Sequence, residues 1–323
     1  MDSIKEAQDS PKTYEDIIST LPKDNGWKKP LYLYQGFWYI AFQLEGVIFA
    51  QQNFQTQPGD IFLCSFPKSG TTWLKALAFA IVTRNRFDPS SNPLLTKQPH
   101  DCVPFLEMDY FENPAISGPG GLSLWATHIP YASLPKSITD SSCKIVYICR
   151  DPKDVFVSLW HYLNKLRADK FEGTPIERAF ELYCNGSSLY GPQWDHVLGY
   201  WKASLERPNQ VLFIQYEDMK KDSIFHLKKL AEFIGYPLSL EEESEGRVQK
   251  IIELCSFENL SNLEVNKTGK RTHREVEGGK MDNNAYFRKG EIGDWKNLLT
   301  SEMGEKLDNI TEKKFSGSGL TFS

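Results

Sequence analysis

The sequence predicts an α/β domain in which helices flank a central parallel β-sheet. Short apolar runs, typical of buried strands, alternate along the chain with segments whose apolar residues recur at helical spacing. Such alternation favours a parallel sheet covered on both faces. The 323 residues contain no internal repeat and no linker long enough to separate two domains. The strands are predicted at 61–64, 122–127, 144–149 and 211–216, and the helices at 73–81, 153–166, 176–184, 194–205 and 223–234.

The most informative segment is the turn that joins the first predicted strand to the first predicted helix. It reads Phe-Pro-Lys-Ser-Gly-Thr-Thr-Trp over residues 66–73. A small-residue turn before a helix directs backbone N–H groups and the positive end of the helix dipole toward one point. A phosphate group is the expected ligand there. Lys68 adds a full positive charge, and hydroxyl groups come from Ser69, Thr71 and Thr72.

This turn departs from the Walker A motif. In that motif four residues separate two glycines, and Lys and Ser or Thr follow the second. Here Lys68 comes first and Gly70 is the only glycine of the turn. We therefore expect a P-loop-like nucleotide-binding core rather than a generic nucleoside triphosphatase. The alternative is an ordinary strand-to-helix turn with a lysine nearby.

A second strand-turn-helix segment carries Arg150 at the end of its strand. The carboxyl ends of parallel strands are where such sheets present ligand-binding groups. Ser158 lies two turns into the following helix and is expected to direct its hydroxyl toward the same site. The alternative is that Arg150 pairs with Asp151 or Asp154 as part of the scaffold.

A third segment near the C-terminal end places Arg288 and Lys289 directly before Gly290. Glycine lets the backbone approach a ligand closely, and an arginine offers a bidentate fork to a phosphate. The segment therefore predicts an anion clamp. A solvated charged turn is the alternative.

His128 ends the predicted strand 122–127 and is followed closely by a proline. With a reference pKa near ~6.5, a histidine can take a proton from a hydroxyl group near neutral pH. We interpret His128 as a candidate general base. The alternative is a structural histidine.

The composition argues against several classes of protein. A net charge of −5 and a pI near 5.8 argue against non-specific nucleic-acid binding. No stretch approaches the ~18–20 apolar residues of a membrane span, and the N-terminus lacks the apolar core of a signal peptide. We therefore expect a cytoplasmic protein without a membrane partner. The six cysteines show no metal-ligand spacing, so no metal is predicted; Cys64, Cys143 and Cys149 are expected to be reduced core residues.

The chain divides into three kinds of segment by composition. Residues 1–20 form a polar lead-in that we expect to be flexible. Residues 21–323 form the single domain. Within it, the strongly polar stretch 264–285 is long for an ordinary loop, and such loops are usually functional or disordered. We predict that this stretch is a mobile lid.

Together, the four segments resemble the motifs of the cytosolic sulfotransferase family, and its plant soluble branch in particular. They occur in the family's order, and the resemblance runs from about residue 27 to the C-terminus. It implies transfer of a sulfuryl group from 3′-phosphoadenosine 5′-phosphosulfate to a hydroxyl group of a small organic acceptor. Adenosine 3′,5′-bisphosphate is the implied product. The resemblance also implies in-line displacement, with His128 as the base and Lys68 assisting the leaving phosphate.

The same resemblance implies which residues contact the nucleotide. The 5′-phosphate would be held by Lys68, Ser69, Gly70, Thr71 and Thr72. The adenine would stack between Trp73 and Phe257, with Tyr216 beside it. The 3′-phosphate would be bound by Arg150, Ser158, Arg288, Lys289 and Gly290. Positioned cations and N–H groups stabilise such a product without a metal.

The acceptor site is predicted from aromatic residues, of which Tyr131, Trp160, His161, Tyr162 and the aromatic residues of the cluster 27–49 are the candidates. An aromatic pocket favours a flat or apolar acceptor. The acceptor classes of the plant branch all stay open: flavonoids or phenolics, steroid-like compounds, hydroxyjasmonate and desulfoglucosinolates.

Two positions depart from the family's pattern. Ala126 stands where animal members often carry a lysine, two residues before the histidine. Ser301 replaces a valine within 296–305, the segment that resembles the family's dimer motif, so we expect a monomer or a weak homodimer. Two other functions also stay open, a non-catalytic binder of adenosine 3′,5′-bisphosphate and a P-loop nucleotide kinase.

Overall fold

A computed structural model of the chain describes residues 13–116, 121, 123–166, 173–272 and 279–322. Its centre is a four-stranded sheet of β4 (Ile61–Ser65), β5 (Leu124–Thr127), β6 (Lys144–Cys149) and β7 (Val211–Gln215). The strand order is β5-β4-β6-β7, and all three pairings are parallel. The predicted α/β class and the four predicted strands are therefore confirmed. The fourth strand ends one residue early because Tyr216 begins a helix, α9 (Tyr216–Lys221).

The order of the strands creates a crevice at one edge of the sheet. The chain runs from β4 to β5 on one side, whereas the next strand, β6, pairs with the other side of β4. The connections after β4 and after β6 therefore leave the sheet in opposite directions. At such a switch point a crevice opens outside the carboxyl ends of the strands. The phosphate loop follows β4, and Arg150 follows β6.

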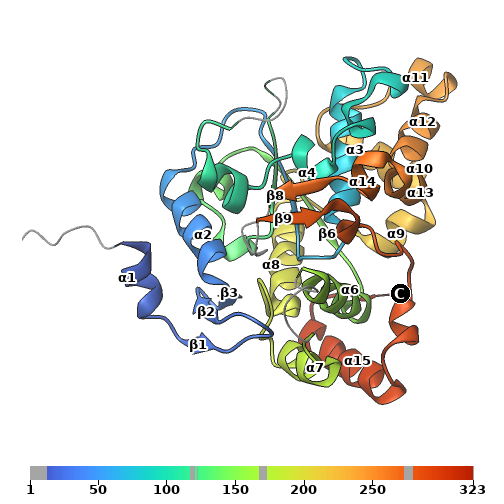
Figure 1. The fold of residues 1–323 in the computed structure, drawn as a ribbon. Coiled ribbons are helices and arrows are strands. Elements are labelled where there is room, and N and C mark those ends of the chain that lie inside the picture. The colour runs from blue at the N-terminus through green and yellow to red at the C-terminus, as the bar shows by residue number, and fades with distance from the viewer. Residues whose placement is uncertain (1–12, 117–120, 122, 167–172, 273–278, 323) are drawn as a thin grey trace, which may run out of the picture.

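Helices cover both faces of the sheet, as Figure 1 shows. Alternate strand residues point to opposite faces. Phe62 and Tyr147 pack in the cluster formed with α6 (Pro152–Lys165), α7 (Ile176–Cys184), α8 (Gln193–Glu206) and α15 (Ser301–Phe315). Leu63 and Val146 pack in the cluster formed with α3 (Thr71–Thr83), α10 (Ser223–Phe233) and α12 (Arg247–Leu254). The five predicted helices are thus confirmed, and both faces of the strands are buried.

Shorter elements connect these layers. The helical ones are α4 (Pro99–Cys102), α5 (Lys136–Thr139), α11 (Leu240–Ser244), α13 (Phe257–Asn262) and α14 (Glu264–Lys267). The 3₁₀ turns are η1 (Pro89–Ser91), η2 (Pro93–Leu95), η4 (Tyr131–Ser133), η5 (Asn283–Tyr286) and η6 (Asp294–Asn297), and η3 (Leu106–Tyr110) is a π-helical turn. Cys64, Cys143 and Cys149 are buried free thiols, as predicted.

The N-terminal region contains structure that the sequence analysis did not predict. Part of the lead-in that was expected to be flexible forms the helix α1 (Tyr14–Ser19). A capping box between Thr13 and Asp16 stabilises the start of this helix. A small antiparallel sheet of β1 (Lys23–Asp24), β2 (Leu31–Tyr34) and β3 (Phe37–Tyr39) follows, and then α2 (Ala41–Asn53). Residues 1–12 lie outside the described residues.

The stretch 264–285 is not a plain loop, so this part of the prediction is wrong. It contains α14, the antiparallel hairpin strands β8 (Lys270–Thr272) and β9 (Lys280–Asp282), and part of η5. Its polar composition concealed the hairpin because only Met281 of the two strands is buried. Residues 273–278 lie outside the described residues. The mobility of this stretch stays a prediction.

Asp154, in the first turn of α6, connects the sheet edge to the C-terminal segment. Its carboxylate pairs with Arg150 at 3.1 Å. It also accepts the backbone N–H groups of Gly293 at 2.8 Å and Trp295 at 3.0 Å. The side chain is 1% exposed, so these three contacts lie away from bulk water. A buried carboxylate with one cation and two N–H donors fixes the end of β6 relative to residues 293–295.

We predict that Asp154→Asn lowers the free energy of unfolding by about 3–5 kcal/mol, because it leaves the buried Arg150 guanidinium without its counter-charge. Urea unfolding followed by circular dichroism measures this change. The control is Asp308→Asn, which removes a half-exposed partner of Lys153. It should cost at most about 1 kcal/mol. Equal losses in the two variants would contradict the role given to Asp154.

Candidate active site

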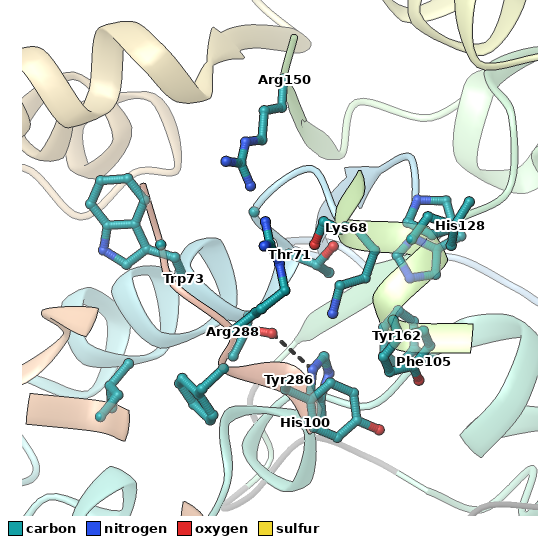
Figure 2. A pocket seen from close by; sticks show the side chains of 18 of the residues that line it. Lys68, Thr71, Trp73, His100, Phe105, His128, Arg150, Tyr162, Tyr286 and Arg288 are labelled. Carbon is teal, nitrogen blue, oxygen red and sulfur yellow. Dashed lines mark hydrogen bonds between the residues drawn. The ribbon is translucent and has the colours of Figure 1, made fainter. Parts of the chain in front are cut away.

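One cavity of about 320 Å³ opens at the carboxyl edge of the sheet. It is lined by the loop after β4, by Arg150 after β6 and by the segment that carries Arg288, Lys289 and Gly290. Segments far apart in the sequence thus meet at the predicted switch-point crevice. In Figure 2, Trp73 and His128 lie toward opposite sides of the view, with Lys68 and Thr71 between them.

The phosphate loop owes its sharp turn to backbone conformations that few residues adopt. Gly70 is the N-cap of α3 and has φ +113°. A Cβ atom there would lie 2.9 Å from the ring of Tyr216. Lys68 itself has φ +68°. Ser65 and Thr71 join strand and helix through a hydroxyl contact of 2.6 Å. The turn therefore requires glycine and presents the first N–H groups of α3, which have no partner within the helix.

Lys68 carries the only side-chain charge of this loop. Its ammonium lies 4.2 Å from the ring centre of Tyr162. Burial in the cavity, together with the charges of Arg288, Arg150 and Lys165, lowers the pKa of Lys68 to about 7. The lysine is surrounded by cations and aromatic rings. A bound anion would restore its positive charge.

The second group of cations comes from Arg150 and the C-terminal clamp. Arg150 lines the cavity, stacks at 4.6 Å from the ring centre of Tyr216 and pairs with Asp154. Arg150 thus forms the ion pair that the scaffold alternative expects, and its role as a binding residue stays a prediction. Arg288 and Lys289 both pair with Asp294. The hydroxyl-bearing Ser158 lines the same cavity from α6, one turn after Asp154.

His128 is held in one tautomer by its surroundings. Its Nδ1 lies 2.7 Å from the carbonyl oxygen of Ser65, which can only accept. Nδ1 therefore carries the proton, and Nε2 has a free lone pair. Burial lowers the pKa of His128 to about 3, although the bond to Ser65 acts in the opposite direction. The ring lines the cavity in its neutral form, as a proton acceptor requires.

The backbone of His128 is fixed from both sides. Its N–H donates to Glu107 at 2.8 Å, and its carbonyl accepts from His196 at 2.9 Å. Glu107 is fully buried and also accepts the hydroxyl of Thr127 at 2.7 Å. Burial raises the pKa of Glu107, while these donors lower it. No pattern in the sequence indicates this role, because Glu107 lies 21 residues before the histidine that it supports.

Three aromatic rings and a glycine form the end of the cavity that is distant from His128. Trp73 meets Tyr216 edge-to-face, with ring centres 5.5 Å apart. The hydroxyl of Tyr216 donates to the carbonyl of Gly290 at 3.0 Å. A Cβ at Gly290 would lie 2.6 Å from the ring of Phe257, so the residue must be glycine. The rings provide a flat, apolar place beside the cations.

Most of the predicted site residues line this one cavity. They are Lys68, Gly70, Thr71, Thr72, Trp73, His128, Arg150, Ser158, Tyr162, Tyr216, Phe257, Arg288, Lys289 and Gly290. Ser69 belongs to the loop but is fully buried and does not line the cavity.

Three of the predicted acceptor candidates, Tyr131, Trp160 and His161, do not line the cavity. Trp160 donates its indole N–H to the carbonyl of Thr174 at 2.8 Å. It is two positions from both Ser158 and Tyr162 on α6. Residues two positions apart on a helix point about 200° apart, so Trp160 faces away from the cavity that Ser158 and Tyr162 line. Tyr131 lies in the turn η4 and packs against Tyr200 at 5.5 Å.

Several cavity residues were missed by the sequence analysis. His100, Phe105, Tyr190 and Arg271 all line the cavity. They come from irregular segments or from elements without a motif, so no sequence pattern connected them. Within the described part of the chain, no group of three or more His, Cys, Asp and Glu residues could hold a metal ion. None of the described helices has both the length and the apolar character needed to cross a membrane.

We predict that His128 stays neutral down to pH 5 in the folded protein. Histidine-selective ¹⁵N NMR measures this, with the signal assigned by its loss in His128→Gln. In the urea-unfolded chain the same ring should titrate near the ordinary value of ~6.5. A midpoint near that value in the folded protein would contradict the effect of burial.

Comparisons with known proteins agree with this geometry. The family model described as the sulfotransferase domain matches residues 58–319. A flavonol sulfotransferase-like protein of Flaveria bidentis is 53% identical over 310 residues, which cover 95% of this chain and 99% of the relative. Cytosolic sulfotransferase 17 of Arabidopsis thaliana is 49% identical over 325 residues, which cover 99% and 93%.

Solved structures are similar as well. A putative steroid sulphotransferase of Arabidopsis thaliana superimposes with a TM-score of 0.74 and 42% identity, covering 95% of this chain and 94% of that one. The mouse sulfotransferase SULT7A1 complexed with PAP gives a TM-score of 0.66 and 28% identity, with coverage of 90% and 95%. This chain belongs to the sulfotransferase family.

Proposed function

We propose that this enzyme transfers a sulfuryl group from 3′-phosphoadenosine 5′-phosphosulfate to a hydroxyl group of a small phenolic acceptor, in the cytoplasm. The observation that carries the proposal is the meeting of two anion sites and a neutral histidine in one cavity. The relatives named as flavonol and cytosolic sulfotransferases support the activity and the compartment.

The polar groups of the cavity fit a nucleotide with two phosphates. Among the described residues, the buried atoms Arg150 Nε and Arg288 Nε, both on cavity residues, have no hydrogen-bond partner. Buried donors are seldom left unpaired unless a ligand or water completes them. The 5′-phosphate would be held by residues 68–72, and the 3′-phosphate by Arg150, Ser158 and residues 288–290. Trp73, Tyr216 and Phe257 would surround the adenine.

The chemistry assigned to the protein is positioning and proton transfer. An acceptor oxygen forms a bond to sulfur as the bond between sulfur and the 5′-phosphate oxygen breaks, and that oxygen keeps the electron pair. Lys68 neutralises the charge that develops on it. His128 Nε2 takes the acceptor's proton, a contribution of typically ~10²–10⁴-fold. No step calls on a metal ion.

The acceptor would lie at the His128 end of the cavity. Aromatic side chains line this end, among them Phe105 and Tyr190, whose ring centres lie 4.9 Å and 5.4 Å from that of His128. Flat rings bind well between such side chains, and two Flaveria relatives are named for flavonol sulfation at defined positions. A flavonol or a similar phenol is therefore the proposed acceptor, ahead of the steroid-like, hydroxyjasmonate and desulfoglucosinolate classes.

We predict that Lys68→Ala and His128→Ala each lower the turnover of a flavonol acceptor by at least about 100-fold. A radiolabelled sulfuryl donor measures the transfer. Calorimetry on the wild type should show binding of adenosine 3′,5′-bisphosphate in preference to ATP. Near-normal turnover in both variants would overturn the mechanism. Preference for ATP would favour a nucleotide kinase, and binding without any transfer would favour a non-catalytic binder.

We also predict that affinity for adenosine 3′,5′-bisphosphate falls as the pH rises above 7. The pKa of Lys68 is about 7 in the free protein. The anion needs the protonated form, so its bound-state pKa is higher and binding takes up a proton. Above pH 7 the dissociation constant should rise by up to about tenfold per pH unit until the bound-state pKa is reached.

Calorimetry from pH 6.5 to 9, in buffers of different ionisation enthalpy, measures both the affinity and the proton uptake. Lys68→Arg keeps the charge throughout this range and should flatten the dependence. An affinity that does not change with pH in the wild type would contradict the lowered pKa.

A further inference from the structure

A buried lysine lies directly behind the phosphate loop and has no place in the mechanism above. Lys75 is on α3, one turn after Thr71, and is fully buried. Among the described residues, no carboxylate lies within ion-pair distance of its ammonium group. Burying an ammonium without a counter-ion is costly, so its contacts require an explanation.

Three groups surround the Lys75 nitrogen. The carbonyl oxygen of Val103 lies at 2.9 Å, Nδ1 of His100 at 3.0 Å, and the ring centre of Phe105 at 3.3 Å. An ammonium has three N–H donors and no acceptor, and this environment offers two acceptors and the negative face of an aromatic ring. Burial lowers the pKa of Lys75. A neutral amine would still keep two N–H groups, one for each acceptor.

The contact with Lys75 is linked to the tautomer of His100. When the lysine nitrogen donates to Nδ1, as a protonated amine must, the ring proton lies on Nε2. Nε2 is 3.1 Å from Oγ of Thr72, the contact drawn as a dashed line in Figure 2. His100 therefore donates to the threonine. The imidazole ring is held in this orientation by stacking on Phe105, with ring centres 5.4 Å apart and planes at 17°.

Thr72 is the second residue of α3 and lines the cavity. A hydroxyl that accepts a hydrogen bond keeps its own proton to donate. When Thr72 accepts from His100, its O–H is therefore free to donate into the cavity. We propose that Lys75 and His100 are positioning residues that orient the Thr72 hydroxyl as a donor to the phosphate of the ligand. This inference rests on the proposed function, since the ligand is the 5′-phosphate of that nucleotide.

The first test needs no ligand. Histidine-selective ¹⁵N NMR of the wild type should show a pyrrole-type signal at Nε2 of His100 and a pyridine-type signal at Nδ1, assigned by their loss in His100→Gln. In Lys75→Met the ring loses its donor to Nδ1, and the Nδ1–H tautomer should become populated. A wild-type ring with its proton on Nδ1 would overturn the proposal, whether or not the protein binds a nucleotide.

The second test is a double-mutant cycle measured by calorimetry with adenosine 3′,5′-bisphosphate. His100→Leu and Thr72→Val should each weaken binding by about 10- to 100-fold, the usual effect of losing a hydrogen bond to a charged group. The double variant should bind no more weakly than either single variant, because both changes remove the same donor. His100→Gln places an amide N–H near the position of Nε2 and should recover most of the affinity.

His226→Leu is the control, since that imidazole lies on α10 and does not line the cavity. It should leave the affinity unchanged. Additive losses in the double variant would mean that His100 acts on the ligand directly or through packing. They would overturn the proposal that His100 acts by orienting the Thr72 hydroxyl. If the wild type itself fails to bind the bisphosphate, the proposed function falls, while the NMR test still decides the tautomer.

Discussion

The carboxylate of Asp154 is the contact on which the rest of the site depends. It connects the end of β6 with the C-terminal clamp, although the two lie nearly 140 residues apart in the sequence. Its two oxygens hold the Arg150 guanidinium and the N–H groups of Gly293 and Trp295. Two further bonds support this connection, from Arg150 to the carbonyl of Glu291 and from Tyr216 to that of Gly290. The buried carboxylate is thus the centre of the contacts that bring two groups of cations to one cavity.

Burial has a different consequence for the two reactive side chains of the cavity. It lowers the pKa of Lys68 to about 7 and that of His128 to about 3. For the lysine, the loss of charge is reversed when an anion binds beside it, so its charge is linked to occupancy. For the histidine, the neutral form is the one that accepts a proton, and the bond from Nδ1 to Ser65 leaves Nε2 for that role. The same apolar surroundings therefore suit both groups.

The fold was largely predictable because its elements carry local signals. The strand at 144–149 and the helix at 176–184 have the predicted bounds, since their apolar spacing is undisturbed by neighbouring motifs. The hairpin of β8 and β9 was not predictable, because exposed polar strands have neither alternation nor a turn signature within the sequence. Helix α1 was missed for a related reason, as only Ile18 of its six residues is buried.

The part of the cavity formed by the phosphate loop and the clamp could be predicted from the sequence, whereas much of its aromatic lining could not. Loops such as 66–73 carry their geometry in glycines and charges at fixed spacing. Residues such as Tyr190 and Arg271 reach the cavity only through long-range packing, which no local pattern records. Trp160 was wrongly included because aromatic character does not reveal which side of a helix a residue occupies. The contact between Lys75 and His100 was missed because the two residues are 25 positions apart and meet only in the folded core.

The central claim is that one cavity contains two distinct anion sites, and calorimetry with two nucleotides tests it most directly. The wild type should bind adenosine 3′,5′-bisphosphate about 10- to 100-fold more tightly than adenosine 5′-phosphate, because charged hydrogen bonds recognise the second phosphate. Arg288→Ala should lose most of this preference and keep its affinity for the 5′-phosphate. An unchanged preference in that variant, or none in the wild type, would contradict the account.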